Sequence, residues 1–396
     1  MRNNHFQHKK RFPRFISLLG RLRPLELPVT HRHNNVELFQ GGRQFFEALF
    51  DAIRCAEHTI LLEYYLIHDD LIGNSLAREL AAAVGRGVSV RLIYDYIGCL
   101  DTPASFFKNL SKQGIELLPF NIPSIKRGFY WFDKRDHRKM TIVDGRMAYL
   151  GGFNIGEEYA GCVAGKQSFR DLGFSIRGDA INELEAIFQE TWSGDGTARR
   201  VAQIRPRPPG SKVGEAAVNI ISGGPRQRRS YIREAFQVNI ASAAEEILIA
   251  TPYFVPGPRI IRSLLRAVRR GVRVRLLLPA RSDVPLVLLL GRSSYTTLLK
   301  GGVEIYELER EILHAKVMLI DGERTVIGSA NLDQRSFHRN YEINCIVDNM
   351  DFGGQIRSLL LEEIAGSCQV KLDIHEQRGR LVRFMERMVR LFSWFL

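Results

Sequence analysis

Hydrophobic and polar residues along this chain form a pattern that occurs twice. In each occurrence a run of apolar residues precedes a stretch with helical periodicity, and a second apolar run follows. The three segments span 59–70, 75–87 and 88–96 in the first occurrence and 246–257, 260–271 and 272–280 in the second. Continuous apolar runs that flank an amphipathic helix are typical of βαβ units. The pattern therefore predicts two such units in a sheet that is covered on both faces.

The similarity between the two halves extends beyond these units. Segment 112–120 resembles 300–308, and segment 136–154 resembles 313–331. The offset between the copies is roughly 180 residues, which indicates an internal duplication. A stretch rich in Pro and Arg begins at Arg205, near the boundary. We interpret the chain as a basic amphipathic N-terminal segment, a first repeat, a linker, a second repeat and an amphipathic C-terminal helix, at 1–34, 35–195, 196–212, 213–370 and 371–396.

The two copies differ in the length of one connection. From Gly114 to His137 the chain advances 23 residues, whereas from Gly302 to His314 it advances 12. The extra segment contains four consecutive aromatic residues, 129–132, with basic residues on either side. Two interpretations are open. The segment is either a buried strand or a loop whose rings lie at a lipid interface or line a substrate channel.

Each half contains one motif of the form H-x-K-x4-D. The first copy comprises His137, Lys139 and Asp144, followed by Asn154 and Asp171; the second comprises His314, Lys316 and Asp321, followed by Asn331 and Glu342. Each asparagine lies 17 positions after its histidine. On an extended strand the histidine and the lysine share a face, and the Asp-Gly turn begins a hairpin whose second strand ends at the asparagine. The pattern predicts that histidine, lysine and asparagine gather in one place.

These residue types suit the exchange of a phosphodiester. A neutral imidazole can attack phosphorus, and a second imidazole can act as acid and base near neutral pH. Lysine and asparagine can hold the non-bridging oxygens, while a carboxylate fixes the tautomer of an imidazole. The scheme needs no cofactor and no metal. The five scattered cysteines show no spacing typical of a zinc site.

The paired motifs, with G-G-F-N and G-S-A-N, resemble those of the phospholipase D superfamily over about residues 35–368. Within it, T-P-Y-F-V-P at Thr251, S-D after Arg281, N-L-D-Q-R-S-F at Asn331 and N-Y-E-I-N-C at Asn340 are similar to bacterial cardiolipin synthases. The resemblance implies an α/β fold with a duplicated phospholipase D-like domain. Its two α/β sheets would pack about a pseudo-twofold axis and share one active site.

The resemblance also implies a two-step mechanism through a phosphohistidine. We expect His137 to attack and His314 to serve first as general acid and then as general base. The lysines and asparagines of both halves would hold the phosphate, and the two later carboxylates would orient the imidazoles in a pairing that the sequence leaves open. Asp144 and Asp321 belong to the catalytic motifs, but each lies at a turn, so a structural role is also open.

The identity of the acceptor is not decided by these residues. A cardiolipin synthase would transfer the phosphatidyl group of one phosphatidylglycerol to another and release glycerol. The alternatives are a phospholipase D that uses water, a phosphatidyltransferase that uses phosphatidylethanolamine, and a nuclease of the same superfamily.

Charge and the chain ends favour a lipid substrate. A net charge of +13 suits anionic membranes and nucleic acids alike. Residues 378–396 combine a narrow arginine face with a wide apolar face, as in a helix that lies in an anionic interface. The alternative is a helix docked on the protein or on another copy. A nuclease has no use for such a face, which argues against nucleic acid. No apolar run reaches the ~18 residues that span a bilayer, so we expect peripheral binding to the inner (cell) membrane, at its cytoplasmic face.

Overall fold

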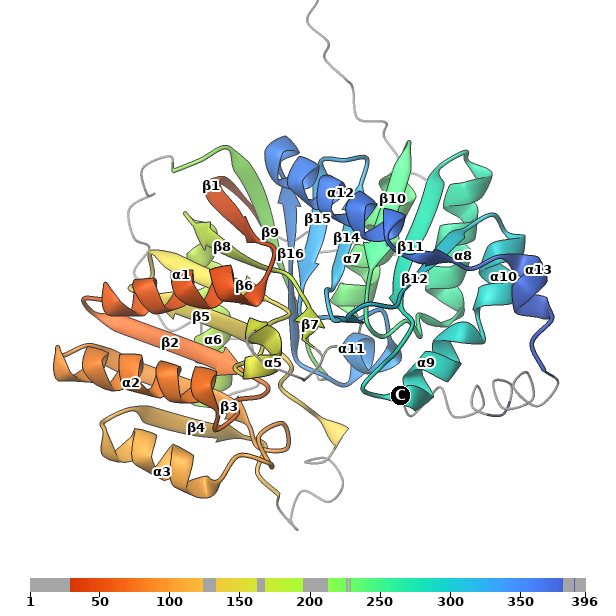
Figure 1. Ribbon diagram of the computed structural model, residues 1–396. Helices are drawn as coiled ribbons and strands as arrows, with labels where there is room; N and C mark the ends of the chain where they lie inside the picture. Colours follow the sequence, from red (N-terminus) through yellow and green to blue (C-terminus); the bar gives the residue numbers. More distant parts are fainter. Residues whose placement is uncertain are drawn as a thin grey trace, which may run out of the picture.

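The computed structural model describes residues 29–123, 133–161, 168–194, 213–225, 227, 229–379 and 388. The aromatic segment 129–132, the predicted linker and most of both terminal segments lie outside these residues. Figure 1 shows two halves side by side, with the first half in red to yellow and the second in green to blue.

Each half contains strands and helices in alternation. The strands of the first half are β1 (Thr30–Phe39), β2 (Thr59–Tyr64), β3 (Ser89–Asp95), β4 (Glu116–Phe120), β5 (Lys139–Val143), β6 (Met147–Gly151), β7 (Phe169–Arg170) and β8 (Gly173–Arg177). Its helices are α1 (Gly42–Arg54), α2 (Leu71–Gly85), α3 (Ala104–Lys112), α5 (Glu157–Ala160) and α6 (Ala180–Ser193). The βαβ unit predicted for this half is confirmed, since β2 and β3 pair in parallel with α2 between them.

The second half repeats this order. Its strands are β9 (Ala216–Gly223), β10 (Glu246–Ala250), β11 (Arg273–Pro279), β12 (Glu304–Leu308), β13 (Ile312–Leu313), β14 (Val317–Ile320), β15 (Arg324–Gly328), β16 (Glu342–Asp348) and β17 (Cys368–Gln369). Its helices are α7 (Tyr231–Ser242), α8 (Gly257–Arg269), α9 (Pro285–Arg292), α10 (Tyr295–Lys300), α11 (Gln334–His338), α12 (Met350–Ala365) and α13 (Leu372–Glu376). Strands β10 and β11 pair in parallel around α8, as predicted.

The two halves join edge to edge. From the junction outward, the first half runs β1-β8-β6-β5-β2-β3-β4 and the second runs β9-β16-β15-β14-β10-β11-β12. These are corresponding strands in corresponding order, which agrees with the duplication predicted from the sequence and with the pseudo-twofold arrangement that the resemblance implies. Antiparallel pairing of β1 with β9 fuses the two sheets into one, with a register shift between His31 and Asn34. Strand β1 begins at Thr30, so it includes residues 30–34 of the predicted N-terminal segment.

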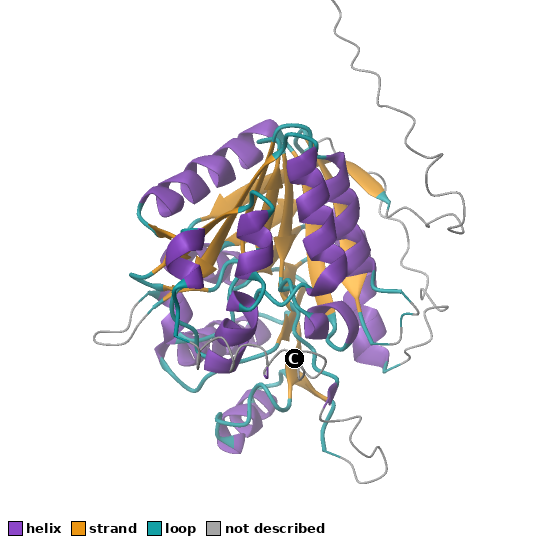
Figure 2. Cartoon of the chain, turned by 90° about the vertical axis from the view of Figure 1, so that its right-hand side faces the viewer, coloured by secondary structure: helices purple, strands orange, loops and turns teal. Residues whose placement is uncertain are grey.

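Local sequence explains the main elements. The apolar residues of β2 are almost entirely buried, because helices cover both faces of the sheet (Figure 2). Helix α2 begins where the carboxylate of Asp70 accepts hydrogen bonds from the N–H groups of Ile72 and Gly73. Among the described residues, none of the helices has the length and apolar character needed to cross a membrane.

Apolar side chains form three main clusters. Two outer clusters lie within single halves, beneath α1, α2 and α3 and beneath α7, α8 and α10. The third is shared and contains residues of α6 and α12 together with strands of both halves, such as Phe174 and Val218. Because this shared core fixes the halves against each other, side chains at their seam can converge with defined geometry.

Candidate active site

The two histidines lie at the seam between the halves. Each belongs to a segment whose backbone pairs with a segment of the other half. Strand β13, directly before His314, pairs in parallel with β7 of the first half. In the same way, Asp136 forms a parallel bridge with Tyr341 of the second half. The N–H of His137 donates to the carbonyl of Tyr341 (2.9 Å), and that of His314 to the carbonyl of Arg170 (2.8 Å). Each histidine is thereby placed beside the carboxylate that follows its backbone partner, Glu342 after Tyr341 and Asp171 after Arg170.

The carboxylates pair with the imidazoles crosswise. His137 Nδ1 lies 3.1 Å from Oε2 of Glu342, and His314 Nδ1 lies 2.5 Å from Oδ2 of Asp171. The pairing that the sequence left open is thus between halves in both cases. A carboxylate at Nδ1 holds the proton there and leaves Nε2 of each ring available for chemistry.

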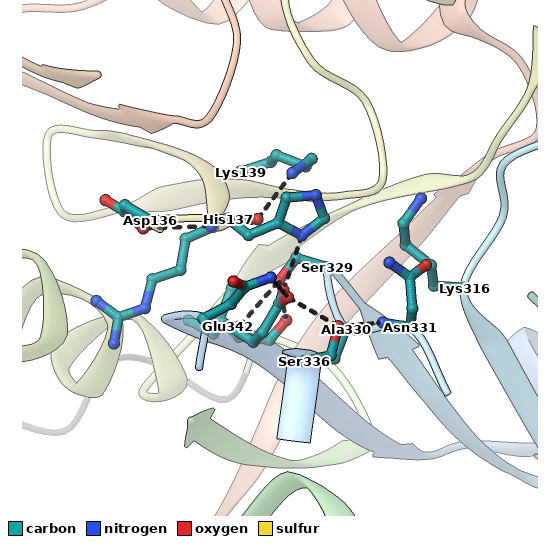
Figure 3. Close-up of polar contacts among 12 residues, drawn as sticks. Asp136, His137, Lys139, Lys316, Ser329, Ala330, Asn331, Ser336 and Glu342 are labelled. Atoms are coloured by element: carbon teal, nitrogen blue, oxygen red, sulfur yellow. Dashed lines mark hydrogen bonds and ion pairs between the residues drawn. The ribbon is translucent and has the colours of Figure 1, made fainter. Parts of the chain in front are cut away.

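Glu342 is held by several donors besides His137. Its oxygens accept hydrogen bonds from the hydroxyls of Ser329 (2.5 Å) and Ser336 (3.0 Å) and from the side-chain amide of Asn340 (3.2 Å), as Figure 3 shows. Burial by itself would raise the pKa of Glu342, but its interaction with His137, the charge of Lys139 and the hydrogen bond of Ser329 lower it overall. The carboxylate therefore stays ionised beside the imidazole.

Both lysines are buried at the same place. Lys139 Nζ donates to the carbonyl of His137 (2.7 Å) and lies 5.3 Å from the ring centre of Tyr65. Lys316 Nζ lies 2.8 Å from Nδ1 of His314 and 3.8 Å from Oδ2 of Asp171. Burial lowers the pKa of Lys139 to about 7, with the charge of Lys316 acting in the same direction and that of Glu342 opposing it. A buried anion between the two ammonium groups would relieve this unfavourable arrangement.

The imidazoles are held in their neutral form. Burial lowers the pKa of His137 to about 4, and the charges of Lys139 and Lys316 add to this effect against that of Glu342. Burial and the Lys316 charge also lower the pKa of His314. Figure 3 shows Lys316 and Asn331, from the second half, beside the ring of His137, from the first. The site is therefore composite, because both halves contribute to it.

The two asparagines complete this group. The amide nitrogen of Asn154 donates to the hydroxyl of Tyr159 (2.7 Å), and the ring of Tyr159 packs 5.4 Å from that of His314. Among the described residues, neither Asn154 Oδ1 nor Asn331 Oδ1 has a hydrogen-bond partner, although both atoms are buried. Buried polar atoms without partners are rare in folded proteins and are consistent with a site that a polar ligand fills.

Comparison with known proteins identifies the family of this chain. The family model described as "Cardiolipin synthase, PLD-like domain" matches residues 49–192 and 237–363, one segment in each half. A protein named cardiolipin synthase from Geobacillus thermodenitrificans is 36% identical over 354 residues, which is 89% of this chain and 70% of that protein. Another of that name from Listeria monocytogenes is 31% identical over 92% of this chain and 76% of its own length.

The chain belongs to the cardiolipin synthase family. It is accordingly an enzyme with phospholipase D-like domains, of the phosphatidyltransferase class.

Solved structures agree with the family at the level of the fold. Phosphatidylserine synthase of Haemophilus influenzae superposes with a TM-score of 0.70 at 13% identity and covers 94% of this chain and 97% of its own. Polyphosphate kinase of Porphyromonas gingivalis superposes with a TM-score of 0.59 at 14% identity, over 91% of this chain and 53% of its own. At such identities the likeness concerns the fold alone.

The aspartates of the two motifs lie away from this site, and their contacts favour the structural role, which their place at a turn left open, over a catalytic one. Asp144 follows the far end of β5, and its carboxylate accepts hydrogen bonds from the N–H groups of residues 57–59 at 2.8–2.9 Å. Asp321 does the same at the end of β14 for residues 244–246. Both have a positive φ, 52° and 51°, which Asp tolerates in turns. These aspartates tie each hairpin to the strand beside it.

A buried charge cluster behind His137 is not evident from the motif. Arg138 lies between His137 and the start of β5, and it donates to Glu63 (3.1 Å), Thr191 (2.9 Å) and, across the seam, Ser222 (2.8 Å). Strand alternation alone could have predicted that Arg138 points away from the lysine. Its partners come from three distant segments, and no local pattern predicts them.

Proposed function

We propose that this chain is a cardiolipin synthase that transfers the phosphatidyl group of one phosphatidylglycerol to another, giving cardiolipin and glycerol, through a phosphohistidine. The observation that carries the proposal is the crosswise pairing of His137 with Glu342 and of His314 with Asp171. Two imidazoles with their Nδ1 atoms fixed and two lysines beside them match the needs of a double displacement at phosphorus.

In the first step, Nε2 of His137 attacks the phosphorus of the donor. The bond from phosphorus to the glycerol oxygen breaks, and His314 gives its Nε2 proton to that oxygen. The lowered pKa of His137 keeps its lone pair free for this attack. The lowered pKa of His314 disfavours the acid form in the empty site, and the negative charge of the arriving phosphate offsets the lysine charge so that His314 can be protonated.

In the second step, a hydroxyl of the second phosphatidylglycerol attacks the phosphohistidine. His314, now neutral, takes the proton of that hydroxyl, and the bond between phosphorus and His137 breaks. One diester is exchanged for another, so the reaction consumes no nucleotide. Transfer to the lipid outcompetes hydrolysis when the acceptor is bound and water is kept from the intermediate.

The decisive experiment is incubation of the purified protein with phosphatidylglycerol in mixed micelles, followed by product analysis. Cardiolipin and glycerol in equal amounts support the proposal, whereas phosphatidic acid alone identifies a hydrolase. Cardiolipin that appears only when phosphatidylethanolamine is added identifies the alternative transferase.

A substrate whose leaving group needs no proton distinguishes the roles of the two histidines. With phosphatidyl-p-nitrophenol, His314→Ala should release one equivalent of p-nitrophenol in a burst and then stall, because the phosphoenzyme forms but lacks its base. His137→Ala should give no burst. The opposite result would exchange the two roles.

For the same protein we propose peripheral binding at the cytoplasmic face of the inner membrane. The support is the net charge of +13 and the arginine and apolar pattern of residues 378–396 in the sequence. Deletion of that segment should weaken binding to phosphatidylglycerol vesicles more than it reduces turnover of a short-chain, water-soluble substrate. Equal losses of both would instead assign the segment to the fold.

A further inference from the structure

The edge of the sheet that carries the histidines also carries two polar loops of the second half. Strands β10 and β11 run parallel, and β10 pairs with β14 so that Ala250, its last residue, lies opposite Val317, the first residue of β14. The loops that follow β10 and β11 therefore emerge beside Lys316. Ligands in open α/β sheets bind at such carboxyl ends.

A tyrosine and an aspartate from these loops form a pair. The hydroxyl of Tyr253, in the loop after β10, donates to Oδ2 of Asp283, in the loop after β11, at 2.6 Å. Burial and the charge of Asp283 raise the pKa of Tyr253, so the phenol keeps its proton and acts as a donor. Asp283 is exposed and also accepts from the hydroxyl of Ser282 (3.2 Å). Its carboxylate is thus held in place but accessible.

This pair lies on the His314 side of the site. Phe254 forms a bridge with Leu332, and the N–H of Val255 donates to the carbonyl of Leu332 (2.8 Å), which places Tyr253 beside the segment that follows Asn331. The charge of Asp283 acts on Lys316 and on Tyr159, whose ring packs against His314. Figure 1 shows α9, which follows Asp283, and α11, which follows Asn331, at the same edge.

The duplication shows what stands at the same two places in the first half. The bridge between Ile67 and Ile155 corresponds to that between Phe254 and Leu332, so Leu66 occupies the place of Tyr253. Strands β3 and β11 begin at Ser89 and Arg273. When the two loops are aligned from these residues, Cys99 occupies the place of Asp283. Cys99 is buried, with its Sγ 3.7 Å from the carbonyl of Tyr65. At these two places the first half therefore carries Leu66 and a buried thiol where the second half carries a tyrosine and an exposed carboxylate.

A phospholipid diester has the same asymmetry about its phosphorus. One ester oxygen leads to an apolar diacylglycerol and the other to a small hydroxylated headgroup. We infer that Tyr253 and Asp283 form a headgroup subsite that binds the free hydroxyls of glycerol beside His314. The inference rests on the proposed function and adds to it the residues that select the polyol.

The chemistry of the pair suits a polyol. An ionised carboxylate can accept several hydrogen bonds, and a carboxylate that binds sugar hydroxyls is the usual device at ribose sites. The positive charges of the two lysines nearby offset the repulsion between this carboxylate and the phosphate. Glycerol bound there would direct its ester oxygen to His314, in agreement with the role of His314 as the acid that protonates this oxygen.

The test compares acceptors at a phosphoenzyme formed without any headgroup. Phosphatidyl-p-nitrophenol serves as donor, and glycerol, 1-propanol and ethanolamine compete as acceptors. The variants are Asp283→Asn, Asp283→Cys, which introduces the first-half residue, and Tyr253→Phe. The control is Asp101→Asn, which removes the same charge from the exposed loop that follows β3 in the first half. Release of p-nitrophenol measures formation of the phosphoenzyme, a step that does not involve the headgroup.

We expect the wild type to prefer glycerol over propanol, and each subsite variant to lose this preference by on the order of tenfold, the effect of one hydrogen bond to a charged group. The first-turnover burst of p-nitrophenol should persist in every subsite variant, and the control should match the wild type in both the burst and the acceptor selectivity. Unaltered acceptor selectivity in all three variants, a wild type that prefers ethanolamine, or variants that also lose p-nitrophenol release would each overturn the subsite. A wild type that forms no cardiolipin from phosphatidylglycerol would instead refute the proposed function, whatever the variants do.

Discussion

The position of Asp144 leads to a prediction that separates stability from catalysis. We expect Asp144→Asn to destabilise the protein while leaving turnover by the folded fraction nearly intact. The carboxylate accepts one hydrogen bond at Oδ2, from Glu57, and two at Oδ1, from His58 and Thr59. An asparagine can keep the two bonds at Oδ1, but it presents an NH2 group to the N–H of Glu57.

The size of the effect follows from these three contacts. A hydrogen bond to a charged group contributes roughly 1.5–3 kcal/mol and one to a neutral group roughly 0.5–1.5 kcal/mol. Loss of one charged bond and weakening of two others therefore amounts to about 4 kcal/mol. Some access of water at the turn reduces this figure to about 3 kcal/mol. Because these bonds lower the pKa of Asp144, their contribution is present above the ordinary pKa of aspartate and is lost as the pH falls through the lowered value.

The assay is urea unfolding followed by circular dichroism, together with kcat for the folded fraction at low temperature. The midpoint should fall with an unchanged slope, and kcat should stay within about threefold of the wild type, because strand β5 separates Asp144 from His137 by about 20 Å. Asp101→Asn, on an exposed loop, is the control for loss of charge. Unaltered stability with a hundredfold loss of kcat would show that the aspartate belongs to the chemistry after all.

Three further predictions concern the site and its support. Glu342→Gln should lower kcat by roughly three orders of magnitude without unfolding the protein, as for the carboxylate of other imidazole pairs; a loss below tenfold would refute the orienting role. The pH profile of kcat/KM should fall below about pH 4, where His137 gains a proton, and above about pH 7, where Lys139 loses one. Lys139→Arg should move only the alkaline limb upward, and an unmoved limb would exclude Lys139 as its origin. Arg138→Met should cost about 3–5 kcal/mol in urea unfolding because it removes the ion-pair partner of buried Glu63; a change under about 1 kcal/mol would contradict this account.

The sequence alone determined the duplication and the βαβ units, and it nominated the candidate reactive groups. Apolar runs and helical periodicity are local properties, and they predicted the βαβ units around α2 and α8 without knowledge of contacts. Two copies of a motif with the same spacing also sufficed to nominate the histidines, the lysines and the asparagines. The same motif left the role of Asp144 and Asp321 open, because spacing alone does not show which end of a strand lies at the site.

Only the tertiary structure decided which groups meet. The crosswise pairing of Glu342 with His137 depends on parallel contacts between segments about 200 residues apart, and Asp283 reaches Tyr253 because β10 and β11 are neighbours in the sheet. Such contacts follow from the packing of a core shared by both halves. Local sequence sets which conformations a segment prefers, whereas the partner across a seam is set by the burial of apolar surface over the whole chain.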